Sequence, residues 1–213
     1  MTKKQIRISV ASIRQGLKGT RMPSDPTRPV MPQDSANWPA AFLERASSGL
    51  KAAAVLIPII EREAGLSVLL TQRSAELRVH AGQVSFPGGR MDEADSDILE
   101  TALRETHEEV GIHPDRVEIA GYLDPSPTVT GFAVTPVVGI VGPRVSIVVD
   151  PREVEAAFEV PLEFLLDKRN QARSTREFEG VQLRIVEFNF AGRRIWGATA
   201  TMLVQLRKKL IKQ

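Results

Sequence analysis

The order of strands and helices expected along this chain predicts an α/β fold with a mixed sheet. Two apolar segments separated by a turn predict a strand hairpin over residues 53–71. An amphipathic helix is expected over residues 97–111, and a second one follows residue 196, after further strands. The chain has 213 residues, 42% of them apolar, which is enough for one domain and an extension. We expect residues 1–50 to form the extension and residues 51–213 the main domain.

Composition excludes several classes of protein and site. The chain contains no cysteine, so it has no disulfide framework, no zinc–thiolate site and no cysteine nucleophile. No apolar segment reaches the roughly 20 residues that a membrane-spanning helix requires. We therefore expect no membrane as a partner. We also expect a small-molecule substrate and no nucleic acid. The composition leaves a homodimer open.

The extension is basic and contains several prolines. Residues 1–50 hold eight of the 28 Lys and Arg residues but three of the 26 Asp and Glu residues. Five prolines between residues 22 and 40 predict a linker or an irregular arm. A mitochondrial transit peptide has this kind of basic start, but we expect a cytoplasmic protein. The extension carries no catalytic pattern, so we expect it to be dispensable for chemistry.

The other elements are predicted from apolar patterning and from turn residues. The first strand, residues 53–60, contains Pro58, which should lie near its end or at an irregularity. A turn at 61–65 leads to the second strand at 66–71. We further expect a short helix at 40–50, strands at 117–123, 133–141 and 145–149, a short helix or turn at 150–155, a loop at 173–179, a hairpin over 181–195, and a last helix with Met202, Leu203, Leu206 and Leu210 buried.

The helix over residues 97–111 has a clear apolar stripe and clear ends. Asp97, with Glu100 three residues later, predicts a capping box, and Gly111 predicts a left-handed C-terminal cap. At 100° per residue, four side chains fall in one stripe that should be buried: Leu99, Leu103, Thr106 and Val110.

Three glutamates near the end of this helix have the spacing of a metal site. Glu105 and Glu109 lie one turn apart, on a flank away from the buried stripe, and two such carboxylates repel each other unless a cation lies between them. Oxygen ligands of this kind suit Mg²⁺ or Mn²⁺, which take substrate phosphate oxygens as further ligands. Arg104 lies one turn before Glu108 and can pair with it. The alternative is a solvated acidic surface.

The segment resembles the Nudix box, whose second half reads Arg-Glu-aliphatic-any-Glu-Glu-any-Gly-aliphatic. Residues 104–112 match that half except at Thr106, where an aliphatic residue is usual. In the first half, Ser96 stands where a glutamate is usual, and Asp95 or Asp97 is expected to take over its structural role. The resemblance implies an α/β/α sandwich and hydrolysis of a phosphoanhydride linked to a nucleoside.

The resemblance also assigns roles to the residues of the box. Glu105 and Glu109 are implied to bind the metal, and Glu108 to be a third ligand or a base reached through water. Arg104 is implied to orient a glutamate. In this family a base often comes from a loop outside the box, and Glu153 is our candidate. Glu155, or a purely structural role for both residues, stays open.

The segment before the box carries candidate phosphate-binding residues. Arg73, Arg78 and His80 precede a Gly- and Pro-rich approach to the metal helix. Arginine is the side chain best matched to phosphate geometry, so two of them indicate a multiply phosphorylated substrate. The alternatives are that His80 binds a loop carbonyl and that Arg73 pairs with Glu76.

This segment also resembles the motif that precedes the Nudix box in coenzyme A pyrophosphatases. The matching residues are Leu70, Thr71, Arg73, Ser74, Gly82, Val84, Phe86, Pro87, Gly88 and Gly89. Gln72 stands where the motif usually has a basic residue. Gly88 and Gly89 are expected, with the two arginines and His80, to contact substrate.

The two resemblances together predict a metal-dependent pyrophosphatase. It would hydrolyse coenzyme A or acyl-coenzyme A to 3′,5′-ADP and (acyl-)4′-phosphopantetheine. A second hypothesis is a pyrophosphatase acting on ADP-ribose or another nucleoside diphosphate derivative, since the metal helix does not choose the substrate. A third is a non-catalytic binding module of the same fold, which would require a damaged metal helix.

Overall fold

The computed structural model describes residues 8–31, 35, 38, 40–75, 82–178 and 181–211. The large sheet contains β1 (Lys51–Arg62), β2 (Gly65–Arg73), β3 (Val84–Ser85), β4 (Gly88–Arg90), β5 (Val117–Tyr122), β6 (Ser126–Pro127), β7 (Phe132–Val141) and β8 (Val154–Pro161). The small sheet contains β9 (Ala172–Phe178), β10 (Val181–Phe190) and β11 (Arg193–Trp196). The helices are α1 (Val10–Leu17), α2 (Ala40–Ser47), α3 (Ile98–Val110), α4 (Leu162–Leu166) and α5 (Gly197–Leu210), with 3₁₀ turns at Pro114–Arg116 and Lys168–Asn170.

The large sheet is mixed, as predicted. β1 pairs in parallel with β7 and forms the expected antiparallel hairpin with β2. Pro58 lies inside β1, between the residues paired with β4 (53–55) and those paired with β2 (59–62). At that change of partner on one edge of β1, a residue without an N–H is tolerated.

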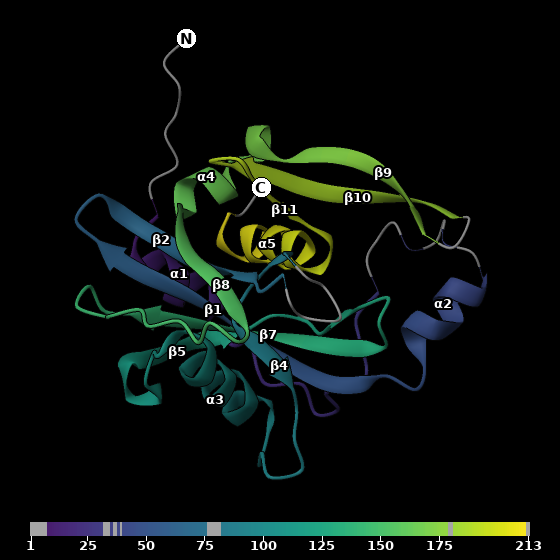
Figure 1. Cartoon of the computed structure of the whole chain (residues 1–213), viewed down its shortest axis with the longest axis horizontal. Helices are drawn as coiled ribbons and strands as arrows, with labels where there is room; N and C mark the ends of the chain where they lie inside the picture. Colours follow the sequence, from purple (N-terminus) through teal and green to yellow (C-terminus); the bar gives the residue numbers. More distant parts are fainter. Residues whose placement is uncertain are drawn as a thin grey trace.

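Helices cover both faces of the large sheet, which confirms the α/β/α sandwich. Figure 1 shows α3 on one side of the sheet and α5 on the other, with the small sheet β9–β11 beyond α5. On the α3 side, Ile98 and Ala102 pack on Ala54 and Leu56 of β1. The opposite side holds the largest cluster of buried apolar side chains.

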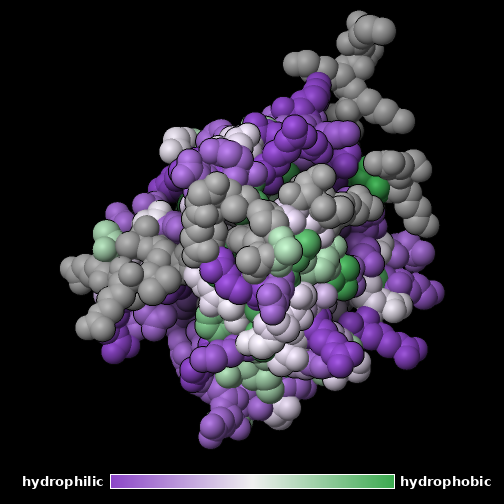
Figure 2. All heavy atoms as spheres, turned by 90° about the vertical axis from the view of Figure 1, so that its right-hand side faces the viewer, coloured by the Kyte–Doolittle hydropathy of each residue, from purple (hydrophilic) through white to green (hydrophobic). Residues whose placement is uncertain are grey.

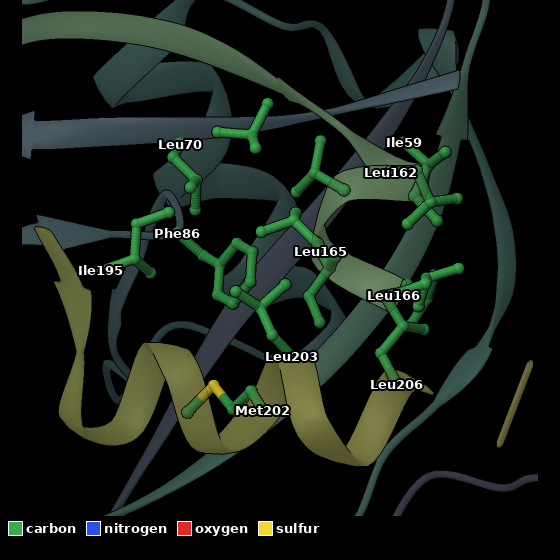
Figure 3. Close-up of a cluster of buried hydrophobic side chains, with 14 of the residues drawn as sticks. Ile59, Leu70, Phe86, Leu162, Leu165, Leu166, Ile195, Met202, Leu203 and Leu206 are labelled. Atoms are coloured by element: carbon green, nitrogen blue, oxygen red, sulfur yellow. The ribbon is translucent and has the colours of Figure 1, made fainter. Parts of the chain in front are cut away.

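The core under α5 connects this helix to the segment that leads into the box. Figure 3 shows Leu203 directed toward Phe86 and Leu165 and Leu206 near Leu166, and Met202 belongs to the same buried cluster. The Thr199 hydroxyl donates a hydrogen bond to the Val84 carbonyl at 3.1 Å. The predicted final helix is therefore confirmed, except that Leu210 is only partly buried. The helix supports β3, which lies just before Gly88 and Gly89.

Part of the N-terminal extension belongs to the same core. Ile13 and Leu17 of α1 are buried among the side chains packed on α5. Arg14 donates two hydrogen bonds to the Glu118 carboxylate, at 2.7 and 2.8 Å. Further along, the Val30 amide donates to the Pro125 carbonyl at 2.8 Å. These contacts attach the extension to the main domain at several points.

Two local predictions were wrong, and the strand β8 was not predicted. Residues 145–149 were expected as a strand but form no regular strand. The turn expected within residues 150–155 is present at 151–153, and β8 begins at Val154. Residues 173–179 were expected as a loop, but the charged sequence forms β9, an edge strand paired with β10. β8 pairs with β2, which is distant in the chain, whereas β9 pairs with β10, the next strand in the chain. In both cases strand pairing decides the structure, which the local pattern alone does not reveal.

No helix in the described ranges is long and apolar enough to cross a membrane. The face that carries α2 is mostly hydrophilic, with smaller hydrophobic areas among the polar ones (Figure 2).

Candidate active site

The start of α3 is fixed by two carboxylates. The Asp97 carboxylate accepts hydrogen bonds from the amides of Leu99 and Glu100, at 2.8 and 2.9 Å, as an N-cap should. Glu100 accepts from the amide of Ser96, one residue earlier than the reciprocal bond of a capping box. Gly111 ends the helix in the left-handed conformation, at φ 73°. Both predicted helix ends are therefore present, and only the Glu100 partner differs.

The buried face of α3 is wider than the predicted stripe. Thr106 and Val110 are fully buried as expected, whereas Leu99 and Leu103 are half-buried. The Thr106 hydroxyl donates to the Ala102 carbonyl at 2.6 Å, so this polar residue fits where an aliphatic one is usual. Because the helix packs against both β1 and β4, the buried face also extends to residues outside the apolar stripe.

Arg104 connects the loop before α3 to the glutamates of the helix. Its guanidinium donates to both carboxylate oxygens of Asp95, at 2.8 and 2.9 Å, to Glu105 at 2.8 Å and to Glu108 at 3.2 Å. The predicted pair with Glu108 is therefore present. Asp95 also accepts from the Thr101 hydroxyl, a residue that the sequence analysis did not single out. Arg104 holds the pKa of Asp95 well below its usual value.

Glu109 is buried, contrary to the expectation of an exposed flank. Its side chain is 2% exposed, and its Oε2 atom has no hydrogen-bond partner among the described residues. Burial raises its pKa to about 8, and the charges of Glu105 and Glu153 add to that rise. The Arg73 guanidinium and the Gly88 amide act in the opposite direction. A carboxylate with a bare oxygen in this setting needs a cation to be stable as an anion.

Glu105 lies against the backbone of β4. A Cβ atom added at Gly89 would come within 2.4 Å of the Glu105 carboxyl group, so only glycine allows this approach. Gly88 adopts φ 151°, and a Cβ there would collide with the backbone of Ala54 in β1. Burial raises the pKa of Glu105, and its hydrogen bond to Arg104 opposes that effect. The two glycines thus allow β4 to lie directly beside α3.

Arg73 lies at the end of β2, and its side chain reaches α3. Its Nη1 atom is 3.7 Å from Oε1 of Glu109. The register between β2 and β8 shifts between Gln72 and Arg73, which is the kind of irregularity that redirects a side chain. Gln72 itself donates to Glu155 at 3.5 Å.

The loop before β8 brings Glu153 to the same place. The Ser74 amide donates to the Glu153 carbonyl at 2.8 Å, and the Asp150 amide donates to the Glu109 carbonyl at 3.0 Å. The Glu153 side chain is exposed, and its charge raises the pKa of both Glu105 and Glu109. The structure therefore brings together Arg73, Gly88, Gly89, the box residues and Glu153.

Two predicted substrate contacts, Arg78 and His80, lie outside the described residues. Glu108 is on the exposed side of α3, with 56% of its side chain accessible, and its described contact is with Arg104. It stays a proposed third ligand or base.

The donors at this site suit a hard divalent cation. In the described part of the chain, no three acidic or histidine side chains converge into a preformed cage. Mg²⁺ commonly uses one or two carboxylates and takes the remaining oxygens from water and substrate phosphates. Oε2 of Glu109 has no partner, and the Glu105 carboxyl is nearby, since its charge contributes to the raised pKa of Glu109. The Glu105 and Glu109 carboxyl groups therefore provide the kind of oxygen ligands that Mg²⁺ takes from a protein.

Comparison with known proteins identifies the family. A NUDIX domain model matches residues 50–191. A Photorhabdus laumondii protein named as the uncharacterized Nudix hydrolase NudL is 42% identical over 167 residues, which cover 78% of this chain and 89% of that protein. A protein of the same name from Enterobacter sp. is 43% identical over 154 residues, which cover 72% of this chain and 80% of that protein.

Solved structures give more distant likenesses. A C. elegans Ap4A hydrolase complex is 20% identical with a TM-score of 0.46, covering 52% of this chain and 80% of that one. A Nudix hydrolase of M. smegmatis, RenU, is 21% identical with a TM-score of 0.45, covering 53% and 71%. Such likenesses say nothing about substrate. The domain match and the two relatives above 40% identity show that this chain belongs to the Nudix hydrolase family.

Proposed function

We propose that this Nudix hydrolase is a metal-dependent pyrophosphatase that cleaves the phosphoanhydride of coenzyme A or acyl-coenzyme A. The products would be 3′,5′-ADP and (acyl-)4′-phosphopantetheine. One observation carries the proposal: Arg73, from the motif that resembles coenzyme A pyrophosphatases, lies 3.7 Å from Glu109, the buried glutamate of the Nudix box. Arg73, which is expected to bind phosphate, and Glu109, which is expected to bind metal, therefore lie side by side.

The proposed metal ligands are Glu105 and Glu109, with Glu108 as a third. Mg²⁺ or Mn²⁺, when bound, supplies positive charge to phosphate oxygens and makes water a better nucleophile at neutral pH. Arg104 holds Glu105 and Glu108 through one guanidinium, so their carboxylates are oriented before substrate arrives. Gly89 leaves the room that the Glu105 carboxyl needs.

Glu153 is the proposed general base. Its exposed carboxylate lies close enough to Glu105 and Glu109 to raise the pKa of both. Its backbone is held by the bond from Ser74, at the end of the strand that carries Arg73. An oxygen of the Glu153 carboxylate would accept the proton of the attacking water. Glu155 is a weaker candidate because its carboxylate accepts from Gln72.

The position of Arg73 also supports a second candidate substrate class, ADP-ribose or another nucleoside diphosphate derivative. Beside Glu109, its guanidinium would meet the scissile pyrophosphate, which coenzyme A and ADP-ribose have in common. Recognition of the 3′-phosphate, which ADP-ribose lacks, would then fall to Arg78 or His80. Arginine remains the better match for a phosphate group.

A hydrolysis panel separates these candidates. Coenzyme A, acyl-coenzyme A, 3′-dephospho-coenzyme A, ADP-ribose and diadenosine polyphosphates would each be incubated with the protein and Mg²⁺ or Mn²⁺, and the products identified. The proposal predicts the highest kcat/KM for coenzyme A or its acyl form, with a clear loss for the dephospho form. An equal kcat/KM for the dephospho form would show that the protein does not recognise the 3′-phosphate. A higher kcat/KM for ADP-ribose would favour the second candidate.

A further inference from the structure

Two arginines contact the glutamates of the site in opposite ways. Every interaction of the Arg104 guanidinium described above is a close hydrogen bond, and its bond to Asp95 is two-pronged. Arg73 instead stands 3.7 Å from Glu109, which is beyond hydrogen-bonding distance. In addition, Nε of Arg73 and Oε2 of Glu109 are both buried without a partner among the described residues. Arg104 is therefore held by close hydrogen bonds, whereas among the described residues the Arg73 guanidinium is held by charge alone.

The backbone around Arg73 is fixed, so any movement is confined to its side chain. The Arg73 amide donates to the Gln83 carbonyl at 2.9 Å, and its own carbonyl accepts from the Gly82 amide at 3.1 Å. The next residue, Ser74, is bound to Glu153. The Arg73 side chain is 26% exposed and the Glu109 side chain 2%. A guanidinium that reaches solvent can leave a buried carboxylate that cannot move with it.

We infer that Arg73 is the counter-ion of the ionised Glu109 carboxylate in the metal-free protein, and that metal binding releases its guanidinium to a phosphate oxygen of the substrate. This inference rests on the proposed function, since it requires the metal at Glu109. A divalent ion in direct contact with Glu109 provides twice the charge at shorter range and repels the guanidinium. The buried Nε–H of Arg73 has no partner in the described part of the chain. A released Arg73 therefore gains most from a phosphate, which accepts paired hydrogen bonds.

This exchange, in which the metal replaces Arg73 at Glu109 and Arg73 moves to the substrate phosphate, makes metal and substrate bind cooperatively. Without metal, Arg73 is engaged by Glu109 and Glu109 repels phosphate. With metal, the carboxylate is neutralised and the arginine is available. Linkage then requires that substrate tighten metal binding by the same factor by which metal tightens substrate binding. Such coupling factors are commonly about 5- to 150-fold.

The test measures Mn²⁺ affinity of the full-length protein without substrate, by calorimetry, for wild type and Arg73→Gln. If Arg73 competes with the metal, Arg73→Gln should bind Mn²⁺ at least about fivefold more tightly. Arg73→Lys, which keeps the charge, should lie closer to wild type. The matched control is Arg152→Gln, which removes one charge near Glu153 from an arginine paired with Asp150. Its Mn²⁺ affinity should equal that of wild type.

The second readout is binding of α,β-methylene-ADP with and without Mn²⁺, with the Mn²⁺–nucleotide complex in solution included in the fit. Mn²⁺ should strengthen nucleotide binding in wild type and do so several-fold less in Arg73→Gln. Unchanged or weaker Mn²⁺ binding by Arg73→Gln would overturn the proposed release of Arg73 but not the assignment of Glu109 as a metal ligand. Unchanged Mn²⁺ binding by Glu109→Gln would overturn the metal assignment as well, so the two failures are distinguishable.

Discussion

Arg104 and Asp95 form a two-pronged hydrogen bond in which both guanidinium donors lie within 2.9 Å of the carboxylate oxygens. Asp95 is in turn held by the Thr101 hydroxyl and the Asp92 amide, each at 2.9 Å. Because the same guanidinium binds Glu105 and Glu108, Asp95 fixes the residue that orients the glutamates. We therefore propose that Asp95, and not the N-cap Asp97, takes over the structural role of the glutamate that the box lacks.

Replacing Asp95 should lower stability in a pH-dependent way. Asp95→Asn removes a charge-assisted pair and should cost about 1.5–3 kcal/mol at pH 7. The pKa of Asp95 is lowered by Arg104, so this stabilisation exists above the pKa of an unfolded aspartate, about 4, and is lost as the pH falls through the lower folded-state value. Urea unfolding of both proteins from pH 7 down to pH 3 should show the difference shrinking.

The control for this variant is Asp97→Asn. Asn is as good an N-cap as Asp, so the hydrogen bonds to Leu99 and Glu100 survive and stability should change little. A loss for Asp97→Asn as large as for Asp95→Asn would contradict the assignment of the structural role to Asp95.

Gly89→Ala should impair the site without unfolding the protein. The added methyl group would lie 2.4 Å from the Glu105 carboxyl, which must move. Because misplacement by about 1 Å can cost about a hundredfold in rate, kcat should fall by at least tenfold while the circular dichroism spectrum is kept. Gly142→Ala is the matched control, since a Cβ there meets nothing within 4 Å. Equal kcat values for the two variants would show that Glu105 needs no such room.

Metal should stabilise the folded protein through Glu109. An ion that binds only the folded arrangement raises the melting temperature, by about 2.7 kcal/mol of stability at a hundredfold excess over Kd. Glu109→Gln should lose this gain. Thermal scans with and without Mn²⁺ measure this gain, and an equal metal-induced rise in both proteins would place the metal elsewhere.

The N-terminal extension should be required for stability, although we expect it to be dispensable for chemistry. Leu17 is buried against the α5 side of the core, so Leu17→Ala should cost about 2–5 kcal/mol. Deleting residues 1–39 removes all of α1 and should destabilise the fold further. Val30→Ala, at a side chain that is half exposed, should cost less than about 0.5 kcal/mol. Denaturant unfolding compares the three, and a truncated protein as stable as wild type would contradict the account.

The features of the fold that could be predicted from the sequence are those set by residues close together in the chain. The hairpin, the caps of α3 and the final helix follow from residues close together in sequence, and all three are present. The burial of Glu109 did not follow, because it is set by β2 and by the loop before β8, which pack on α3 from distant parts of the chain. The same holds for α1, whose burial depends on α5.

Within the site, residue identity was more predictable than environment. The box residues and Arg73 could be named from spacing and resemblance, and the structure places them together. The choice of Asp95 over Asp97 required geometry, since both are acidic residues near the helix start. The close approach of Gly89 to Glu105 also required geometry, because the only sign of such a backbone contact in the sequence is the glycine itself.

The measurement that decides the account is product formation from coenzyme A, followed side by side for wild type, Glu105→Gln and Glu109→Gln. With Mg²⁺ or Mn²⁺, wild type should release 3′,5′-ADP and 4′-phosphopantetheine. Both variants should stay folded and lose kcat by orders of magnitude, because each removes a proposed metal ligand. Activity of both variants within about threefold of wild type, well below the 10²-fold that one misplaced group can cost, would contradict the metal assignment. Absence of these two products from wild type would contradict the substrate.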